Sequence, residues 1–246
     1  MRVLAITKIF PNSLEPLSSP FNAQQFTELA TMCDLTVLEA IPYFPAASLT
    51  GTPPRAAKLA ALPRRETVCG IDTIYMRQLY VPRVGLPAAL PLYVASLLPY
   101  RKLAARFDLI FATWAYPDGC AAVVFAGLLG KPCVVKVHGS DVNVVAKRRG
   151  VRSMMTRVLP RADAMVTVSA PLGEELAAMG IARERIFLVK NGVDEQLFAP
   201  RDRDAARAEL GLPLGRPIIA FVGRLEPQKG VGDLLDAFEK IGRAHV

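Results

Sequence analysis

The sequence predicts an α/β fold: a parallel sheet with helices on both faces, followed by the opening unit of a second domain of the same kind. Short apolar runs alternate with segments of helical composition, as they do in βαβ units. Several of the runs are continuously apolar, which is expected where both faces of a sheet are covered. Near the end of the chain, the apolar run 217–222, a basic loop and an amphipathic segment at 231–240 repeat the strand–loop–helix order.

Residues 1–194 supply most of the predicted elements and form the first of these two parallel-sheet domains. Strands are expected at 3–7, 35–39, 73–76, 108–113, 132–138, 164–169 and 186–189. Helices are expected at 22–32, 91–106, 119–129, 152–159 and 172–179, between segments that contain turn-forming residues. The Pro- and Ala-rich segment 41–64 indicates a long excursion that contains some helix.

The remainder of the chain predicts a linker and an incomplete domain. Residues 195–216 are charged and interrupted by Pro and Gly, which is typical of an interdomain connection, with one short helix at 204–210. Residues 217–240 then open a truncated second domain. Residues 241–246 correspond to the translation of ATC GGA AGA GCA CAC GTC, a string found in a common sequencing-library adapter, and we expect them to be an artefact. Residues from about 195 onward are expected to be poorly packed, because their apolar side chains lack the rest of a sheet.

Composition narrows the class of protein. The 246 residues are 52% hydrophobic and 21% charged, a core-forming balance and not a disordered one. The net charge of +8 fits a solvated Arg-rich surface, an anionic substrate or an anionic membrane surface. Nucleic acid is not expected, because the basic residues are scattered and no nucleic-acid-binding motif occurs. Four cysteines without a CxxC pair and only two histidines give no support for a zinc site.

Polar side chains follow the predicted strands, and ligands of open α/β sheets bind at that edge. The residues in question are Trp114, Tyr116, Asp118, His138, Gly139, Ser140, Asp141, Ser169, Asn191 and Asp194. Some have simpler roles open to them: Asp118 can cap the helix that follows, and Asn191 with Gly192 can form a turn. His138 is the only histidine of the first domain. It follows a predicted strand, where it can be a hydrogen-bonded interior residue or can contact a ligand.

The loop from Gly223 to Gly230 combines two cations with a predicted helix start. Arg224 and Lys229 lie where free N–H groups and the helix dipole favour an anion, so a phosphate site is predicted. A solvated loop is the alternative. The chain contains no GxSxG, P-loop, HExxH or GxGxxG pattern, and no general base can be named from spacing.

Four stretches in this order resemble glycosyltransferase family 4: 138–141, 168–170, 191–200 and 222–230. The resemblance covers nearly the whole chain and implies a GT-B fold, with two Rossmann-like domains facing across a cleft. It implies metal-independent sugar transfer with retention and no cofactor besides a nucleotide-diphosphate sugar as donor substrate. Catalysis would involve Arg224, Lys229 and His138, and donor binding would involve Gly223, Arg224, Lys229 and Gly139. The acceptor side or cleft would be lined by Trp114, Tyr116, Asp118, Ser140, Asp141, Ser169, Asn191 and Asp194.

The resemblance also implies binding partners, and two alternative functions remain open. Expected partners are a nucleotide sugar, a glycan or lipid-linked acceptor and an anionic membrane surface, for a cytoplasmic protein at the inner face of the cell membrane. Two departures stand out: loop 11–20 lacks the glycines of many members, and no paired-glutamate motif follows residue 240. The chain as it stands is therefore expected to be inactive. A nucleotide-sugar epimerase and a non-catalytic binding module remain as alternatives.

Overall fold

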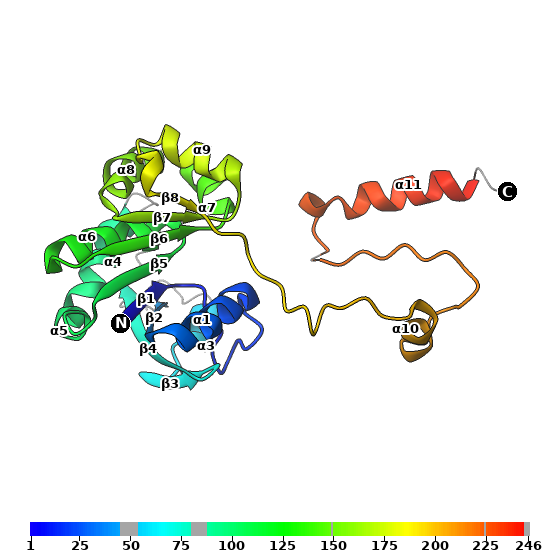
Figure 1. The fold of residues 1–246 in the computed structure, drawn as a ribbon, viewed down its shortest axis with the longest axis horizontal. Helices are drawn as coiled ribbons and strands as arrows, with labels where there is room; N and C mark the ends of the chain where they lie inside the picture. The colour runs from blue at the N-terminus through cyan, green and yellow to red at the C-terminus, as the bar shows by residue number, and fades with distance from the viewer. Residues whose placement is uncertain (45–53, 80–87, 149, 224, 244–246) are drawn as a thin grey trace. The chain divides into compact units, whose positions relative to one another are not determined.

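The chain divides into two units, Met1–Gly192 and Val193–Val246. The structure is a computed structural model that describes residues 1–44, 54–79, 88–148, 150–223 and 225–243. The first unit contains an eight-stranded sheet flanked by helices, and the second contains two helices joined by extended chain (Figure 1).

The sheet of the first unit is parallel except at one edge. Its strand order is β3-β4-β2-β1-β5-β6-β7-β8, and only β3 and β4 pair antiparallel. The predicted α/β class and the parallel sheet are therefore confirmed. The strands are β1 (Arg2–Thr7), β2 (Asp34–Tyr43), β3 (Arg65–Val68), β4 (Ile71–Leu79), β5 (Leu109–Thr113), β6 (Cys133–Val137), β7 (Ala164–Thr167) and β8 (Ile186–Leu188).

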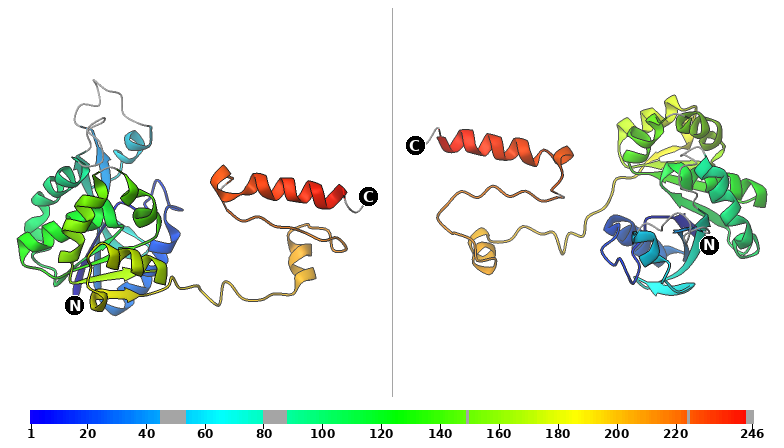
Figure 2. Two further views of the ribbon diagram at one scale, coloured as in Figure 1. Left: turned by 90° about the horizontal axis from the view of Figure 1, so that it is seen from above. Right: turned by 180° about the vertical axis from the view of Figure 1, so that it is seen from behind.

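Helices cover both faces because successive strand residues point to opposite sides (Figure 2). Leu4 and Ile6 of β1 belong to the larger core, with helices α4, α6, α8 and α9, whereas Val3 and Ala5 pack with Phe26 of α1. The helices of this unit are α1 (Pro20–Met32), α3 (Pro54–Leu59), α4 (Ala89–Leu97), α5 (Arg101–Ala104), α6 (Cys120–Leu129), α7 (Ser140–Asn143), α8 (Val151–Val158) and α9 (Ala170–Ala178).

The edge hairpin β3–β4 was not predicted, because the β3 sequence Arg-Glu-Thr-Val is polar and short. Its two-residue turn has φ of 50° at Cys69 and 77° at Gly70, the conformation that matches the twist of hairpin strands. Strand β2 is also longer than expected. It pairs with β4 as far as Tyr43, whereas β1 ends opposite Glu39. Strands β2 and β4 therefore extend past the end of β1.

The glycine-free loop after β1 is held by side chains. Asn12 Oδ1 accepts hydrogen bonds from the backbone N–H groups of Leu14 and Glu15, at 3.1 and 2.8 Å. Arg55 of α3 forms an ion pair with Glu15 at 2.7 Å. At its end, Ser19 adopts φ 48° and ψ 55°, a left-handed conformation that glycine adopts more easily. These contacts hold the loop after β1 in one conformation, whereas glycines would leave its backbone more freedom.

The second unit buries none of its described residues. It contains α10 (Arg203–Glu209), capped by Asp202, and α11 (Val231–Arg243). The expected strand at 217–222 is not formed, because no described segment pairs with it. Val222 is 96% exposed and Phe238 57% exposed, so large apolar side chains of this unit face solvent. Among the helices that the structure describes, none is long and apolar enough to cross a bilayer.

Candidate functional site

The unsatisfied polar atoms of the first unit point to one end of the sheet. Among the described residues, four buried side-chain atoms have neither a hydrogen-bond partner nor an ion-pair partner: Asn22 Oδ1, Glu39 Oε2, Trp114 Nε1 and His138 Nε2. Trp114 and His138 directly follow β5 and β6, Glu39 pairs with the last residue of β1, and Asn22 lies in the first turn of α1. Buried polar atoms are normally satisfied, so this concentration marks the carboxyl end of the sheet as the candidate site.

Asp141 organises the loops at this end. Its fully buried carboxylate accepts hydrogen bonds from the backbone N–H groups of Gly139 (2.8 Å), His138 (3.1 Å) and Val142 (3.2 Å), and from that of Ala115 at 2.8 Å. One carboxylate thus ties the loop after β5 to the loop after β6. Gly139 takes φ 118°, a conformation that side chains disfavour, which accounts for a glycine at this position. Asp141 therefore positions its neighbours and does not face an open surface.

His138 is an uncharged side chain in this setting. Its ring lies 5.1 Å from the ring of Phe21 and 6.4 Å from that of Trp114, measured between centroids. Burial lowers the pKa of His138 to about 4; Asp141 opposes the shift and the Lys136 ammonium adds to it. At neutral pH the imidazole therefore offers one hydrogen-bond donor and one acceptor, which suits a hydroxyl group.

Trp114 lies between His138 and a charged pair. Its φ of 86° is unusual for a bulky residue, and such conformations concentrate at functional sites. The ammonium group of Lys8 lies 5.3 Å from the centre of the indole ring and 3.3 Å from the Asp118 carboxylate. Asp118 is fully buried and accepts a hydrogen bond from Tyr93 at 3.2 Å. The helix-cap alternative for Asp118 is not realised, because the N-cap of α6 is Gly119 and no side chain caps it.

A row of buried polar side chains crosses the sheet beneath α1. Glu39, Thr7, Thr113 and Lys136 occupy matched register positions on four adjacent strands, and each is at most 3% exposed. Thr113 donates to Thr7 at 2.7 Å, and Asn22 of α1 donates to Thr113 at 3.3 Å. The start of α1 packs on this polar layer through Asn22.

Lys136 is a buried cation bound by neutral partners. Its Nζ donates to Gln25 Oε1 at 2.7 Å and to Asn191 Oδ1 at 3.0 Å, and within the described ranges no carboxylate pairs with it. Burial lowers its pKa. Lys136 thereby joins β6 to α1 and to the residue that precedes Gly192, where the first unit ends.

The remaining predicted residues of the first unit take varied positions. Tyr116 is fully buried and its hydroxyl lies 3.5 Å from Met154 Sδ, so it packs in the core instead of lining a cleft. Ser140 is the exposed first residue of α7, and Ser169 is the half-buried N-cap of α9 without a side-chain cap bond. The sequence motifs do not indicate Lys8, Asn22, Glu39 or Lys136. For Glu39 and Lys136, the available signal is a charged residue inside an otherwise apolar strand.

The predicted donor-side residues belong to the second unit. Gly223 adopts φ 158°, and Lys229 ends a short 3-10 turn (Pro227–Lys229) just before α11, with an exposed side chain. Arg224 lies outside the described residues. Asp194 is exposed, and its carboxylate accepts bonds from the N–H groups of Gln196 and Leu197, so it forms a local turn. Among the residues that the structure places, no group of three His, Cys, Asp or Glu could hold a metal ion.

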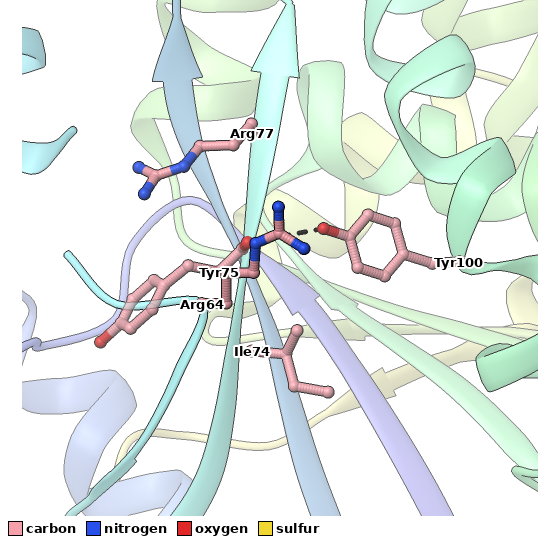
Figure 3. Close-up of a pocket in the computed structure, with 5 residues that line it drawn as sticks. All are labelled: Arg64, Ile74, Tyr75, Arg77 and Tyr100. Atoms are coloured by element: carbon pink, nitrogen blue, oxygen red, sulfur yellow. Dashed lines mark hydrogen bonds between the residues drawn. The ribbon is translucent and has the colours of Figure 1, made fainter. Parts of the chain in front are cut away.

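A large cavity lies elsewhere, at the outer edge of β4. Its volume is about 550 Å³, and the residues that border it are Arg64, Ile74, Tyr75, Arg77 and Tyr100 (Figure 3). The Arg77 guanidinium already donates to the carbonyl oxygens of Leu59, Ala60 and Leu62, and the Tyr100 hydroxyl lies 3.5 Å from the Tyr75 carbonyl oxygen. None of its lining residues has an unsatisfied buried atom, so the strand-exit cluster remains the better candidate.

The neutral state of His138 leads to a testable pH dependence. The folded pKa of about 4 lies below the ordinary value of 6.5, so the unfolded chain binds the extra proton first as the pH falls. Stability is therefore fully present above pH 6.5 and is lost between 6.5 and 4, by at most about 3 kcal/mol. The chain has only two histidines, so an NMR titration of the ring protons can be assigned with His245→Gln. Titration of His138 near pH 6.5 would contradict the half-buried, uncharged ring.

Comparison with known proteins now identifies the family. Residues 28–197 match the family described as Glycosyltransferase Family 4. This chain is a member of glycosyltransferase family 4. The match spans β2 to β8 and includes Trp114, His138 and Asp141 of the candidate site. The resemblance seen in the sequence motifs is therefore confirmed.

Curated relatives agree with this membership. A Bacillus subtilis protein named as a teichuronic acid biosynthesis glycosyltransferase, TuaC, is 29% identical over 98% of this family 4 chain. D-inositol 3-phosphate glycosyltransferase 1 of Catenulispora acidiphila is 43% identical over 64% of it. The chain spans 63% of the length of the first relative and 39% of the second.

Solved structures show the same fold. The crystal structure of Anabaena Alr3699/HepE in complex with UDP matches with a TM-score of 0.63 and 18% identity, covering 98% of this family 4 chain and 58% of HepE. UDP-N-acetylglucosamine 2-epimerase from Rickettsia bellii matches at 0.50 and 12% identity over 87% of the chain and 52% of the epimerase. A match in fold therefore does not separate a glycosyltransferase from an epimerase, whereas the family match and the curated relatives do.

Proposed function

We propose that the whole protein is a glycosyltransferase that moves a sugar from a nucleotide-diphosphate sugar to a glycan or lipid-linked acceptor. The observation that carries the proposal is that the region matched by family 4 contains Trp114 and His138, whose buried side-chain nitrogens have no hydrogen-bond partner at the carboxyl end of the sheet. The orphaned indole N–H of Trp114 presents a donor, and the orphaned Nε2 of neutral His138 can donate or accept a hydrogen bond. Sugar hydroxyls can satisfy both.

The chemistry proposed for the donor side is electrostatic. Arg224 and Lys229 belong to the stretch of sequence that precedes α11, and a helix start favours phosphate oxygens. Two cations there would stabilise the charge that develops on the departing nucleotide diphosphate. The transfer would proceed with retention and without a metal ion. HepE was solved with UDP and with UDP-glucose, which supports a UDP-sugar as the first donor to test.

The first unit is proposed to hold the acceptor. Trp114, Asp118 and Lys8 surround the exits of β1 and β5, where aromatic and charged side chains suit a polyol. TuaC is named for teichuronic acid biosynthesis, which supports a cell-envelope polysaccharide as the product class. The protein would then work at the inner face of the cell membrane, on an acceptor anchored there.

A protein of the full length of the curated relatives tests this function. Lys229→Ala is expected to lower kcat by about 100-fold or more, because a charge contact made in the transition state is lost. Lys240→Ala, on the exposed side of α11, is the control and is expected to change kcat less than about twofold. The chain 1–246 alone should give no turnover. EDTA should leave the rate unchanged, and the product anomer should match that of the donor.

The products that form distinguish the proposed glycosyltransferase from an epimerase and from a binding module. Conversion of the nucleotide sugar to its epimer without an acceptor would support the epimerase alternative. Donor binding without turnover, across a panel of acceptors, would support a binding module. Sugar transfer by the longer protein that is insensitive to Lys229→Ala would contradict the proposed donor site alone.

A further inference from the structure

Lys136 is a buried charge that the stability of the first unit does not require. It is 2% exposed, and within the described ranges its ammonium group contacts two neutral amide oxygens and no carboxylate. A buried cation loses its hydration, and neutral acceptors offset only part of that loss. Methionine has nearly the same length and would fill the position without this cost. The charge at this position therefore points to a role other than stability.

The two partners of Lys136 do not depend on its charge. Asn191 is exposed and Gln25 is half-buried, so the amide oxygens of both can accept hydrogen bonds from water. A polar group that reaches water carries little penalty when its protein partner is lost. Replacing the ammonium group by an apolar one should therefore leave the stability of the first unit unchanged or raise it.

The geometry of β6 and α1 places Lys136 next to His138. The two residues are two positions apart, so their side chains point to the same face of the sheet, the one that α1 covers. Helix α1 contacts both: Gln25 accepts the Lys136 hydrogen bond at 2.7 Å, and the Phe21 ring, one helical turn earlier, lies 5.1 Å from the His138 ring. Burial is the main cause of the low pKa of His138, and the Lys136 ammonium group adds to it, as expected for a cation close to the ring.

We propose that Lys136 is a positioning residue for sugar transfer and acts on His138 through α1. Its bond to Gln25 holds the first two turns of α1 against β6, and Phe21 in the same helix then limits the positions that the imidazole ring can take. Its bond to Asn191 adds the end of the first unit to the same assembly. The inference rests on the proposed function, in which Nε2 of His138 contacts a sugar hydroxyl.

Nuclear magnetic resonance of the chain 1–246 tests this contact without an activity assay. In wild type, we expect a nuclear Overhauser effect between the ring protons of Phe21 and His138, whose centroids are 5.1 Å apart. Lys136→Met should abolish this effect and should not lower the urea concentration at the midpoint of unfolding. Lys131→Met is the control, because Lys131 is a half-buried lysine near the other end of β6 whose side chain has no hydrogen bond or ion pair among the described residues.

A second variant removes the same contact from the side of α1. Gln25→Ala leaves the sheet untouched and should abolish the effect between Phe21 and His138, as Lys136→Met does. An unchanged effect in either variant overturns the proposal. A urea midpoint of Lys136→Met well below that of wild type also overturns it, because Lys136 would then be a structural residue.

Kinetics of the longer protein test the consequence for sugar transfer. Lys136→Met is expected to lower kcat by about 10-fold or more with little change in KM for the nucleotide sugar, because a misplaced group weakens contacts made in the transition state. Lys131→Met should change kcat less than about twofold.

A double variant shows whether Lys136 acts through His138. Lys136→Met combined with His138→Ala should lose no more activity than His138→Ala alone, because the two residues act as one unit. Losses that multiply would show that Lys136 acts independently of the ring and would overturn the proposal. If wild type transfers no sugar, the proposed function fails, whereas the resonance comparison still decides whether Lys136 positions His138.

Discussion

Asp141→Ala is expected to lower the free energy of unfolding of the first unit by about 3 to 5 kcal/mol. The carboxylate is fully buried and accepts bonds from four backbone N–H groups in two loops. Alanine would leave those donors without partners and would free the His138 loop. Urea unfolding followed by fluorescence measures the change well, because Trp114 is the only tryptophan and lies in one of the two loops.

Asp163→Ala is the matched control for this substitution. Asp163 is exposed and accepts one backbone hydrogen bond, from Cys133 at 2.8 Å, so its loss should lower stability by about 1 kcal/mol or less. Equal destabilisation by the two substitutions would show that Asp141 does not organise the loops. Asp141→Asn keeps one carbonyl oxygen as an acceptor and is expected to fall between the two.

Glu39→Gln is expected to stabilise the protein at alkaline pH and to leave it unchanged at pH 4. Burial raises the pKa of Glu39 from 4.5 to about 8, against hydrogen bonds from Asn12 and the Phe10 N–H. The folded state therefore holds a proton that the unfolded state releases, and stability is lost as the pH rises from 4.5 to 8. Glutamine cannot ionise, so the variant should gain about 4 kcal/mol over wild type at pH 8.

Thermal unfolding at several pH values measures this difference. Glu66→Gln supplies a comparison of opposite sign: burial alone would raise the pKa of Glu66, but bonds from Tyr75 and Ser13 outweigh it and the pKa is lowered. Its removal should cost stability above pH 4.5, where Glu39→Gln helps. A gain from Glu39→Gln that is the same at pH 4 and pH 8 would show that the effect comes from packing and not from ionisation.

Local sequence patterns predicted most of the first unit. The apolar runs at 3–7, 108–113 and 132–138 became neighbouring parallel strands, because a run without alternation is stable where both faces are covered. The polar edge strand β3 was missed, since its sequence shows no apolar pattern. The run at 217–222 was expected to be a strand but is unpaired, because strand propensity requires a neighbour for its hydrogen bonds.

The site shows a similar division. Strand exits placed Trp114 and His138 at one edge, as the topology of parallel sheets requires. The partners of Lys136 are 111 and 55 residues away in sequence, and no local pattern indicates them. The role of Asp141 could not be predicted either, because a sequence motif does not show whether a carboxylate contacts a ligand or backbone N–H groups of its own chain.

Sequence alone determined the α/β class and the family, because periodicity and motifs are properties of neighbouring residues. Tertiary structure alone decided which polar groups are buried together. Glu39, Thr7, Thr113 and Lys136 form one layer only because four strands from different parts of the chain pair in a particular register. Burial then lowers the pKa of His138 and raises that of Glu39, since desolvation disfavours whichever form carries the charge.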